Sequence, residues 1–520
     1  MYIPEVHGIS YDDFYKFFHG GGLIIGAQNV TIEGSRIINV TGGIMLVRSN
    51  NTRITNSLIK DCDVALEIWD SSFIVFENTT VTNCDGIRIQ SISDSAISRS
   101  TIKNLKIYFY MGNCKNVIIS NNTIEKIGGG FTIRDSNNIT ISKNTLKEIN
   151  YSITLYHTYN VTFNGNVISG NTGGGVTILD CILNNITNNM FFNQAIFLQG
   201  ENESTFSTTV LKNNTVNGKP IIYILKQKFS KLEYNNTIGE LIIALSVGLT
   251  VTNLHISDSG IGVEITHSDN IRLINSAIRD THKGIVIKKS RSVFVRNTLF
   301  ENCSVAIKAS QFSCIRVENN TVTNASIGIY YHTHYSWYRY ILTRSQILQN
   351  TIKFSHFAIL VIDSETTFIE NNTIANNDYG IVLEQSRSSY MITARNNNIF
   401  ENQYGIVSSY IDNFTIRENI ISHNEYGIFA EYSANIRIIN NTITNNQVGI
   451  YVKETRDITL FDNVFMNNTV ILQKAIIKNK VFSLVYNLIG VWVVLTSLLL
   501  YIRYKKKKYL LKHSDKPINQ

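Results

Sequence analysis

Residues 371–382 read NNTIANNDYGIV, and this phrase recurs with small changes along much of the chain. Its Tyr-Gly-Ile part returns at 404–406 and at 426–428, two copies that stand 22 residues apart. In the polar stretches between copies, aliphatic residues alternate with other residues, as at Ile436 and Ile438. Such alternation has the period of a β-strand. Three short strands and three turns use about 22 residues, so one repeat closes one triangular coil.

The same spacing governs the first half of the chain, where Asn-Thr-Ile or a near copy begins at Asn122, Asn144 and Asn166. The sequence has only 3 Pro and is rich in strand formers and in Asn, which tolerates the left-handed conformation of tight turns. A β-sandwich would show irregular strand spacing and more Pro. We therefore predict an all-β, right-handed parallel β-helix solenoid over residues 23–470, forming one rod of roughly twenty coils.

Stacked coils bring like residues into ladders. Asn ladders at the turns would satisfy their own amide groups. Cys62 and Cys84 stand one repeat apart, so a disulfide or two buried thiols would fit, and we expect the thiols. The six cysteines include no Cys-x-x-Cys pair and no Cys/His ligand spacing. We assign no metal site and no cofactor.

Three segments break the repeat, near residues 201–248, 330–342 and 384–395. The first contains an Asn-Gly pair at 217–218, which is typical of a tight hairpin turn. Insertions in a solenoid leave the stack as loops, and loops are common binding elements. Residues 1–22 are expected to form an N-terminal cap or a truncated first coil, because an open first coil exposes a sheet edge.

The C-terminal region predicts a membrane anchor. Residues 471–480 form a juxtamembrane linker, and the 22 residues 481–502 carry no charge, which suits a transmembrane helix. Residues 503–520 hold seven basic side chains and one acid. Because basic residues favour the cytoplasmic side, we expect a cytoplasmic tail and an extracellular β-helix at the cell membrane. The first residues show neither a basic n-region nor an apolar h-region of a signal peptide.

The charge of the chain argues against nucleic acid as a partner. The formal net charge is +8, and the tail alone supplies +6 of it. The remaining chain is close to neutral, without the basic footprint that a polyanion such as nucleic acid requires.

The Asn-Asn-Thr-Ile and Tyr-Gly-Ile units, together with NNTVNGKPIIYIL at 213–225, resemble the parallel β-helix (PbH1) repeats of NosD-like and CASH (carbohydrate-binding and sugar hydrolase) domains. The resemblance covers nearly the whole ectodomain and implies a prokaryotic cell-surface solenoid. It is specific for fold and poor for function. NosD acts in copper-site maturation of nitrous oxide reductase, but this chain lacks a methionine-rich metal motif.

The aromatic insertion supplies the candidate ligand contacts. Aromatic faces stack on sugar rings and Arg binds acidic groups, although the same rings could pack along the rod. The candidate residues are Tyr331, His332, His334, Tyr335, Trp337, Tyr338 and Arg339. Two histidines without a third ligand do not predict a metal site. The Tyr379, Tyr404 and Tyr426 series is expected to be a structural ladder.

No catalytic residue is assigned. The best acidic cluster, Asp61, Asp63, Asp70 and Asp85, is expected to consist of solvated turn residues. We therefore predict a membrane-anchored, non-catalytic protein with a binding or structural role at the cell envelope, with polysaccharide as a candidate ligand. A polysaccharide lyase, hydrolase or epimerase is the alternative, and a NosD-like accessory protein in metal-site maturation is the second alternative.

Overall fold

The computed structural model describes residues 23–475 apart from 27, 173, 235–236, 312, 333–343, 365 and 386–390. These residues form an all-β parallel solenoid of about 19 turns with rungs of about 22 residues, which confirms the predicted repeat. Strand β15 (Asn137–Ser142) illustrates the register, because it pairs in parallel with β18 (Tyr159–Asn164), one coil later. Ile139 lies beside Val161, and both are buried.

Each coil contributes a strand to each of three faces. One face holds the 9-stranded sheet from β2 (Thr31–Glu33) to β24 (Val210–Lys212). Its counterpart later in the chain is an 11-stranded sheet: β27 (Lys231–Glu233), β29 (Thr250–Thr252), β31 (Arg272–Ile274), β33 (Val293–Arg296), β36 (Ile315–Glu318), β39 (Arg344–Leu348), β42 (Thr366–Glu370), β45 (Met391–Arg395), β48 (Asp412–Arg417), β51 (Ala434–Ile439) and β54 (Arg456–Phe461).

A second face carries most of the long strands. In the first half of the chain these are β4 (Gly42–Val47), β7 (Val64–Trp69), β9 (Thr80–Gln90), β11 (Thr101–Gly112), β14 (Phe131–Arg134), β17 (Ile153–Tyr156), β20 (Val176–Leu179) and β23 (Ile196–Gln199). In the second half they are β26 (Lys219–Leu225), β28 (Glu240–Ala244), β30 (His255–Thr266), β32 (Ala277–Lys288), β35 (Val305–Ser310), β38 (Ile327–His332), β41 (Phe357–Ile362), β44 (Tyr379–Glu384), β47 (Tyr404–Ser409), β50 (Tyr426–Glu431), β53 (Val448–Lys453) and β56 (Val470–Ala475).

Buried asparagines hold successive coils in register. Asn121 takes a φ of 56°, a left-handed turn conformation that Asn tolerates. The next residue, Asn122, is buried, and its Nδ2 donates to Asn144 Oδ1 at 3.0 Å and to the Ile97 carbonyl at 2.9 Å. Asn144 Oδ1 also accepts the backbone N–H of Asn122 at 2.9 Å. Both donors of the Asn122 amide, and both acceptor positions of Asn144, are therefore used, as the sequence predicts.

These ladders run through both halves of the chain. One comprises Asn122, Asn144, Asn166, Asn189 and Asn214. A second comprises Asn320, Asn350, Asn372, Asn397, Asn419 and Asn441. A third, at another corner of the coil, comprises Asn377, Asn402, Asn424 and Asn446.

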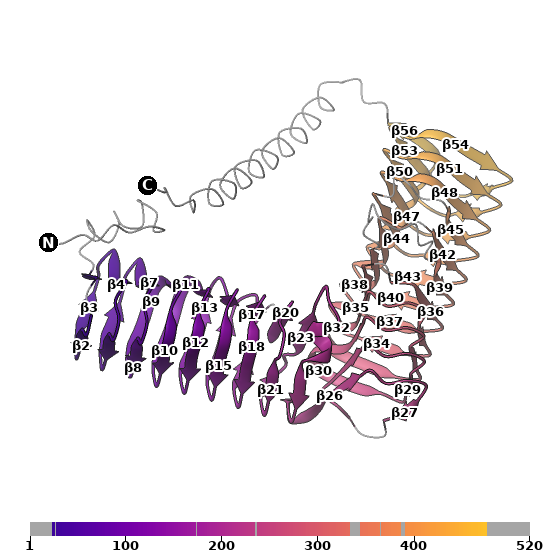
Figure 1. Ribbon diagram of the computed structural model, residues 1–520. Helices are drawn as coiled ribbons and strands as arrows, with labels where there is room; N and C mark the ends of the chain where they lie inside the picture. The colour runs from indigo at the N-terminus through magenta and orange to yellow at the C-terminus, as the bar shows by residue number, and fades with distance from the viewer. Residues whose placement is uncertain are drawn as a thin grey trace, which may run out of the picture.

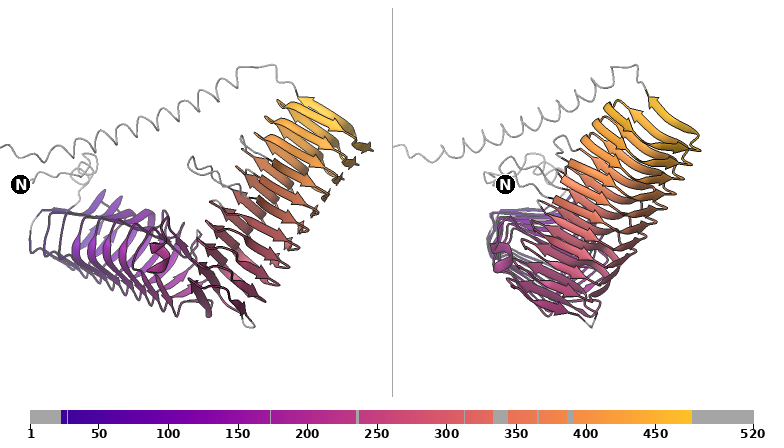
Figure 2. Two further views of the ribbon diagram at one scale, coloured as in Figure 1. Left: turned by 45° about the vertical axis from the view of Figure 1, so that its right-hand side comes forward. Right: turned by 90° about the vertical axis from the view of Figure 1, so that its right-hand side faces the viewer.

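The predicted single rod is wrong in one respect, because the coils form two stacks that meet at an angle, here called the elbow (Figures 1 and 2). Strand β25 (Thr215–Val216) ends the first stack and pairs antiparallel with β26. Asn217 and Gly218 form the two-residue turn between them, with φ of 49° and 78°. Two positive φ values identify the tight hairpin turn that the Asn-Gly pair predicts. Because the hairpin reverses the chain, the next coil starts a new stack, and each stack has its own hydrophobic core.

The structure describes part of each predicted insertion. Residues 201–248 are not one loop, since they include helix α2 (Ser204–Ser207), the hairpin and the start of the second stack. Residues 330–332 belong to β38, and 391–395 form β45, so these parts of the other two insertions lie in the stack. The predicted segments 1–22, 481–502 and 503–520 lie outside the described residues. Within the described part of the chain, no helix has the length and apolarity needed to cross a membrane.

Replacing Asn166 by Leu should destabilise the first stack, because the backbone N–H of Asn144 and the side chain of Asn144 each lose an acceptor in a buried position. We expect the free energy of unfolding to fall by about 3 kcal/mol. Chemical denaturation followed by circular dichroism measures this. Asn137→Ala, at an exposed position on a neighbouring coil, is the control and should change stability by less than about 0.5 kcal/mol. Equal effects of the two substitutions would contradict the structural role of the ladder.

Candidate binding site

The long-strand faces of the two stacks lie on the inner side of the elbow (Figure 1). Some of these strands turn their solvent-facing side toward the inside of the elbow, and we call this surface the inner face. It is formed by β14, β17, β20, β23, β32, β35 and β38. Parallel register aligns its side chains in columns, so that Arg134 stands beside Tyr156 and Thr177 stands beside Phe197. The Arg134 guanidinium lies 5.1 Å from the centre of the Tyr156 ring. The first stack thus offers an arginine and aromatic rings on successive coils.

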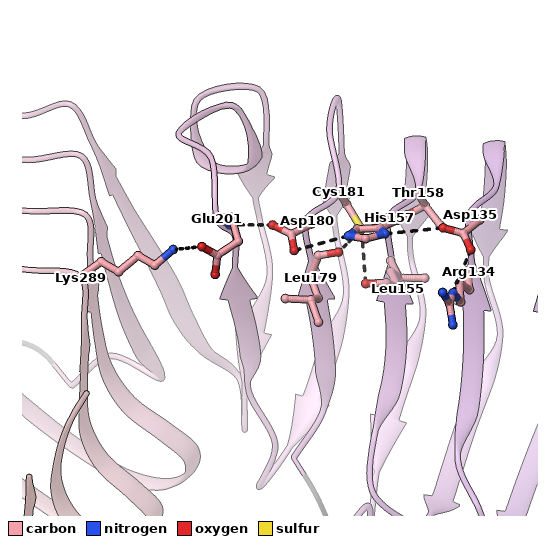
Figure 3. Close-up of polar contacts among 10 residues, drawn as sticks. All are labelled: Arg134, Asp135, Leu155, His157, Thr158, Leu179, Asp180, Cys181, Glu201 and Lys289. Carbon is pink, nitrogen blue, oxygen red and sulfur yellow. Dashed lines mark hydrogen bonds and ion pairs between the residues drawn. The ribbon is translucent and has the colours of Figure 1, made fainter. Parts of the chain in front are cut away.

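A row of charged turn residues borders this surface (Figure 3). His157 Nδ1 lies 3.6 Å from Asp135 Oδ1, and His157 Nε2 lies 3.6 Å from Asp180 Oδ2. Asp180 Oδ1 accepts the backbone N–H of Glu201 at 2.6 Å. The Glu201 carboxylate forms an ion pair with Lys289 of the second stack at 2.5 Å. The row therefore connects the two stacks across the elbow.

Three lysines gather where the stacks meet. Lys288 Nζ lies 4.3 Å and Lys283 Nζ lies 5.0 Å from the centre of the Phe197 ring. Two ammonium groups of strand β32 therefore lie over one aromatic ring of the first stack. Lys308 Nζ, on β35, lies 5.2 Å from the centre of the Tyr330 ring. Among the described residues, no carboxylate lies within 4.0 Å of these three ammonium groups. We call Lys283, Lys288 and Lys308 the lysine corner.

Partial burial makes the charges of the lysine corner unfavourable. Burial lowers the pKa of Lys288 to about 8, although the Glu264 carboxylate counteracts this shift. Burial is also the main cause that lowers the pKa of Lys283 and of Lys308, and the charge of Lys308 lowers the pKa of Lys283 further. Desolvated ammonium groups without a direct counter-ion are stabilised when an anion approaches.

Two buried carboxyl groups close the edge of the first stack. Glu240 Oε2 accepts the backbone N–H of Ile196 at 3.0 Å, and Glu264 Oε2 accepts that of Leu198 at 3.1 Å. Both donors belong to β23, the last strand of the first stack on the inner face, whose N–H groups would otherwise be unpaired in the interior. Burial raises the pKa of Glu240 well above its ordinary value and that of Glu264 to about 8.

The aromatic insertion is only partly described. The prediction that Tyr331 contacts a ligand is wrong for this structure, because its side chain is buried and its hydroxyl donates to the Ser313 carbonyl at 3.1 Å. His332 retains 24% exposure and lies 4.0 Å from Asp363. The remaining candidates lie outside the described residues: His334, Tyr335, Trp337, Tyr338 and Arg339.

Other sequence predictions concern the ladders. The Tyr379, Tyr404 and Tyr426 rings stack with centres 4.9 and 5.0 Å apart, which confirms a structural ladder. Because these rings face one another, their faces do not form a platform for sugars. Cys62 and Cys84 are buried free thiols, as expected.

The acidic cluster of the sequence behaves as ordinary turn residues. Asp61 takes a φ of 54° and accepts a hydrogen bond from Asn83 at 3.0 Å. Asp85 forms an ion pair with Lys106 at 2.9 Å. Asp63 lies one coil before Asp85, whose backbone N–H donates to the Asp63 carbonyl at 2.9 Å, and Lys106 stands near the carboxylates of both residues.

The lysine corner and the two glutamates were not predicted. One signal is visible in the sequence, because Lys-Gly-Ile-Val at 283–286 replaces the Tyr-Gly-Ile-Val of 379–382. This substitution marks a coil whose outward surface differs from the repeat.

The solved structures that match the chain include two epimerases and an adhesin. The periplasmic alginate epimerase AlgG is 13% identical, with a TM-score of 0.28 over 70% of this chain and 77% of that chain. The A-module of the Azotobacter vinelandii mannuronan C-5 epimerase AlgE4 is 12% identical, with a TM-score of 0.25 over 75% and 89%. The Streptococcus pneumoniae surface protein and adhesin PfbA is 13% identical, with a TM-score of 0.18 over 77% and 91%. At these scores no functional argument follows, and no curated protein matches the chain in sequence.

The buried glutamates should make stability depend on pH. A carboxyl group whose pKa is higher in the folded state binds more protons folded than unfolded between the two pKa values. For Glu264 this interval runs from 4.5 to about 8, so stability should fall as pH rises through it. Glu264→Gln keeps an acceptor for Leu198 and should flatten the dependence in a thermal melt series. Glu401→Gln, at an exposed position, should leave it unchanged. A slope identical in wild type and Glu264→Gln would contradict this assignment.

Two family models match the sequence. The model described as "Periplasmic copper-binding protein (NosD)" matches residues 77–243 and 332–483, and that of the right-handed β-helix region matches 6–130 and 240–399. Among the described residues, no group of three or more His, Cys, Asp or Glu side chains could hold a metal ion. We therefore derive no copper chemistry from the described residues. By the extent of the first match, which exceeds half of its length, the chain belongs to the NosD family of right-handed β-helix proteins.

Proposed function

We propose that this protein is a membrane-anchored β-helix of the cell envelope that binds a polysaccharide on the inner face of its elbow. The observation that carries the proposal is the lysine corner, in which three partly buried ammonium groups lie against aromatic rings without a carboxylate within 4.0 Å among the described residues. Ammonium groups held in this way favour an anionic ligand, because the ligand replaces the solvation that burial removes.

The neighbouring residues suit a sugar chain. Arg134 and Tyr156 stand on adjacent coils of the first stack, and the Tyr156 ring stacks on His157 with centres 3.8 Å apart. A guanidinium binds carboxylate or sulfate groups, and aromatic side chains supply apolar contact to sugar rings. These residues continue the inner face beyond the lysine corner, which supports an extended ligand.

The anchoring part of the proposal rests on the sequence. The uncharged stretch 481–502 is long enough to span a bilayer, and the basic tail 503–520 favours a cytoplasmic end. The β-helix would then stand outside the cell, where envelope polysaccharides are its neighbours. Protease added to intact cells should remove the β-helix and spare the tail. Protection of the β-helix would contradict this orientation.

The lysine corner can be tested by charge removal. In the double variant Lys283→Gln/Lys288→Gln of the full chain in detergent micelles, affinity for polygalacturonate should fall about tenfold or more. Affinity for neutral dextran should stay unchanged. Lys115→Gln removes an exposed lysine of the first stack and is the matched control. Wild-type affinity in the double variant would overturn the proposed site.

A second candidate function is catalysis on a polysaccharide. Its supporting observation is His157, whose imidazole lies 3.6 Å from a carboxylate on each neighbouring coil and could transfer protons to or from a sugar. Incubation of the wild-type chain with polyuronates would release shortened or epimerised products under this alternative, and His157→Ala would abolish them. We expect no product from either protein.

A further inference from the structure

A groove on the outward surface of the 11-stranded sheet is lined by arginines from four successive coils. Arg272, Arg296, Arg316 and Arg344 come from β31, β33, β36 and β39, and Phe294 and Glu318 lie among them. The groove has a volume of about 480 Å³. These strands lie on the side of the second stack away from the inner face (Figure 1).

The solenoid register sets the spacing of the arginines. Arg272 stands beside Phe294, and Phe294 stands beside Arg316, so the two arginines occupy one column two coils apart. Arg296 belongs to the next column, where it stands beside Glu318. Arg344 lies two residues before Gln346, the neighbour of Arg316, and so belongs to a third column. The groove therefore receives one arginine from each coil, distributed over three columns.

The groove carries an excess of positive charge. Arg316 is neutralised, because its Nε lies 2.8 Å from Glu318 Oε2. The Arg316 guanidinium also lies 5.7 Å from the centre of the Phe294 ring, which holds it against the floor of the groove. Arg272, Arg296 and Arg344 are exposed, and the described residues place no carboxylate within 4.0 Å of their guanidinium groups.

We propose that this arginine groove binds an acidic polysaccharide, with carboxylate or sulfate groups of successive sugars held by Arg272, Arg296 and Arg344. A guanidinium presents a planar fork of donors that matches both anions, whereas a neutral glycan gains nothing from three unpaired charges. A linear polymer fits better than a small anion, because one polymer can reach all three guanidinium groups, which come from different coils. The groove belongs to a different sheet from the lysine corner and does not depend on it.

Single-stranded nucleic acid is the competing polyanion. Its binding sites combine basic residues with aromatic side chains on which successive bases stack. In this groove the aromatic side chain, Phe294, lies beneath the Arg316 guanidinium, and the positions on either side of it in its column are Arg272 and Arg316. The groove therefore offers no series of ring faces to bases, which favours a glycan.

Cys314 provides a direct reporter of occupancy. It lines the groove, and it is the one cysteine of the six that is not fully buried. Alkylation of Cys314 in the native full-length chain, read by mass spectrometry of the digested protein, measures access to the groove. Polygalacturonate and dextran sulfate supply carboxylates and sulfates, neutral dextran supplies neither, and an oligothymidylate supplies phosphates with bases.

We expect polygalacturonate or dextran sulfate to slow alkylation of Cys314 at least about fivefold at low salt, and added salt to reverse this protection. The triple variant Arg272→Gln/Arg296→Gln/Arg344→Gln should weaken binding about tenfold or more. Its thermal melt should match that of the wild type, which verifies that the coils are still folded. Arg437→Gln, an exposed arginine on β51 of the same sheet, and Lys283→Gln/Lys288→Gln should both retain protection.

Three results would overturn the proposal. The first is absence of protection by both acidic polymers, and the second is equal protection in wild type and in the triple variant. The third is stronger protection by the oligothymidylate than by either polysaccharide, which would make nucleic acid the ligand. Loss of binding in the lysine variant with Cys314 protection intact would separate the two sites.

Discussion

The buried Asn amide is the interaction on which the rest of this structure depends. An asparagine in the interior of a ladder, such as Asn144, accepts the backbone N–H and the side-chain N–H of the preceding ladder residue and donates to two groups in turn, so its position relative to the neighbouring coils is fixed. A shift of one residue would leave buried amide groups unpaired, and each would cost about 1–3 kcal/mol. Register is therefore strongly specified, and outward residues with the same place in the repeat form columns. The surface chemistry of the protein follows from which residues occupy those columns.

The elbow shows how the chain ends one stack and starts another. A terminated solenoid exposes the N–H groups of its last strand, and here Glu240 and Glu264 accept two of them. Burying a carboxyl group is unfavourable when it is ionised, which is why its pKa rises. The hydrogen bonds from the Ile196 and Leu198 backbone N–H groups offset part of this cost. The result is a junction that brings side chains of both stacks onto one concave side of the molecule.

The repeat could be predicted from the sequence because each of its residues has a local reason: Asn121 for the turn, Asn122 for the ladder and Ile124 for the core. The Asn217-Gly218 turn could be predicted equally well. The start of a second stack after this turn could not be predicted, because a hairpin signal does not say whether the chain returns to the same stack. The lysine corner escaped prediction for a related reason. Lys283 and Lys288 belong to one strand, but Phe197 of the first stack reaches them only through the elbow. Tyr331 was misassigned since alternation alone does not say which side of a strand faces inward.

The two basic surfaces differ in construction. The lysine corner is partly buried, and its charges come from the junction of two stacks, whereas the arginine groove is exposed and follows the axis of one stack. The lysine corner can form only if the coils make two stacks that meet at the elbow, and this two-stack arrangement is our central claim. Small-angle X-ray scattering of residues 1–475 tests it most directly. A straight rod of about 19 turns would be near 90 Å long. We expect a shorter maximum dimension and a scattering profile of two joined arms, and a profile of a single straight rod of that length would contradict the two-stack structure.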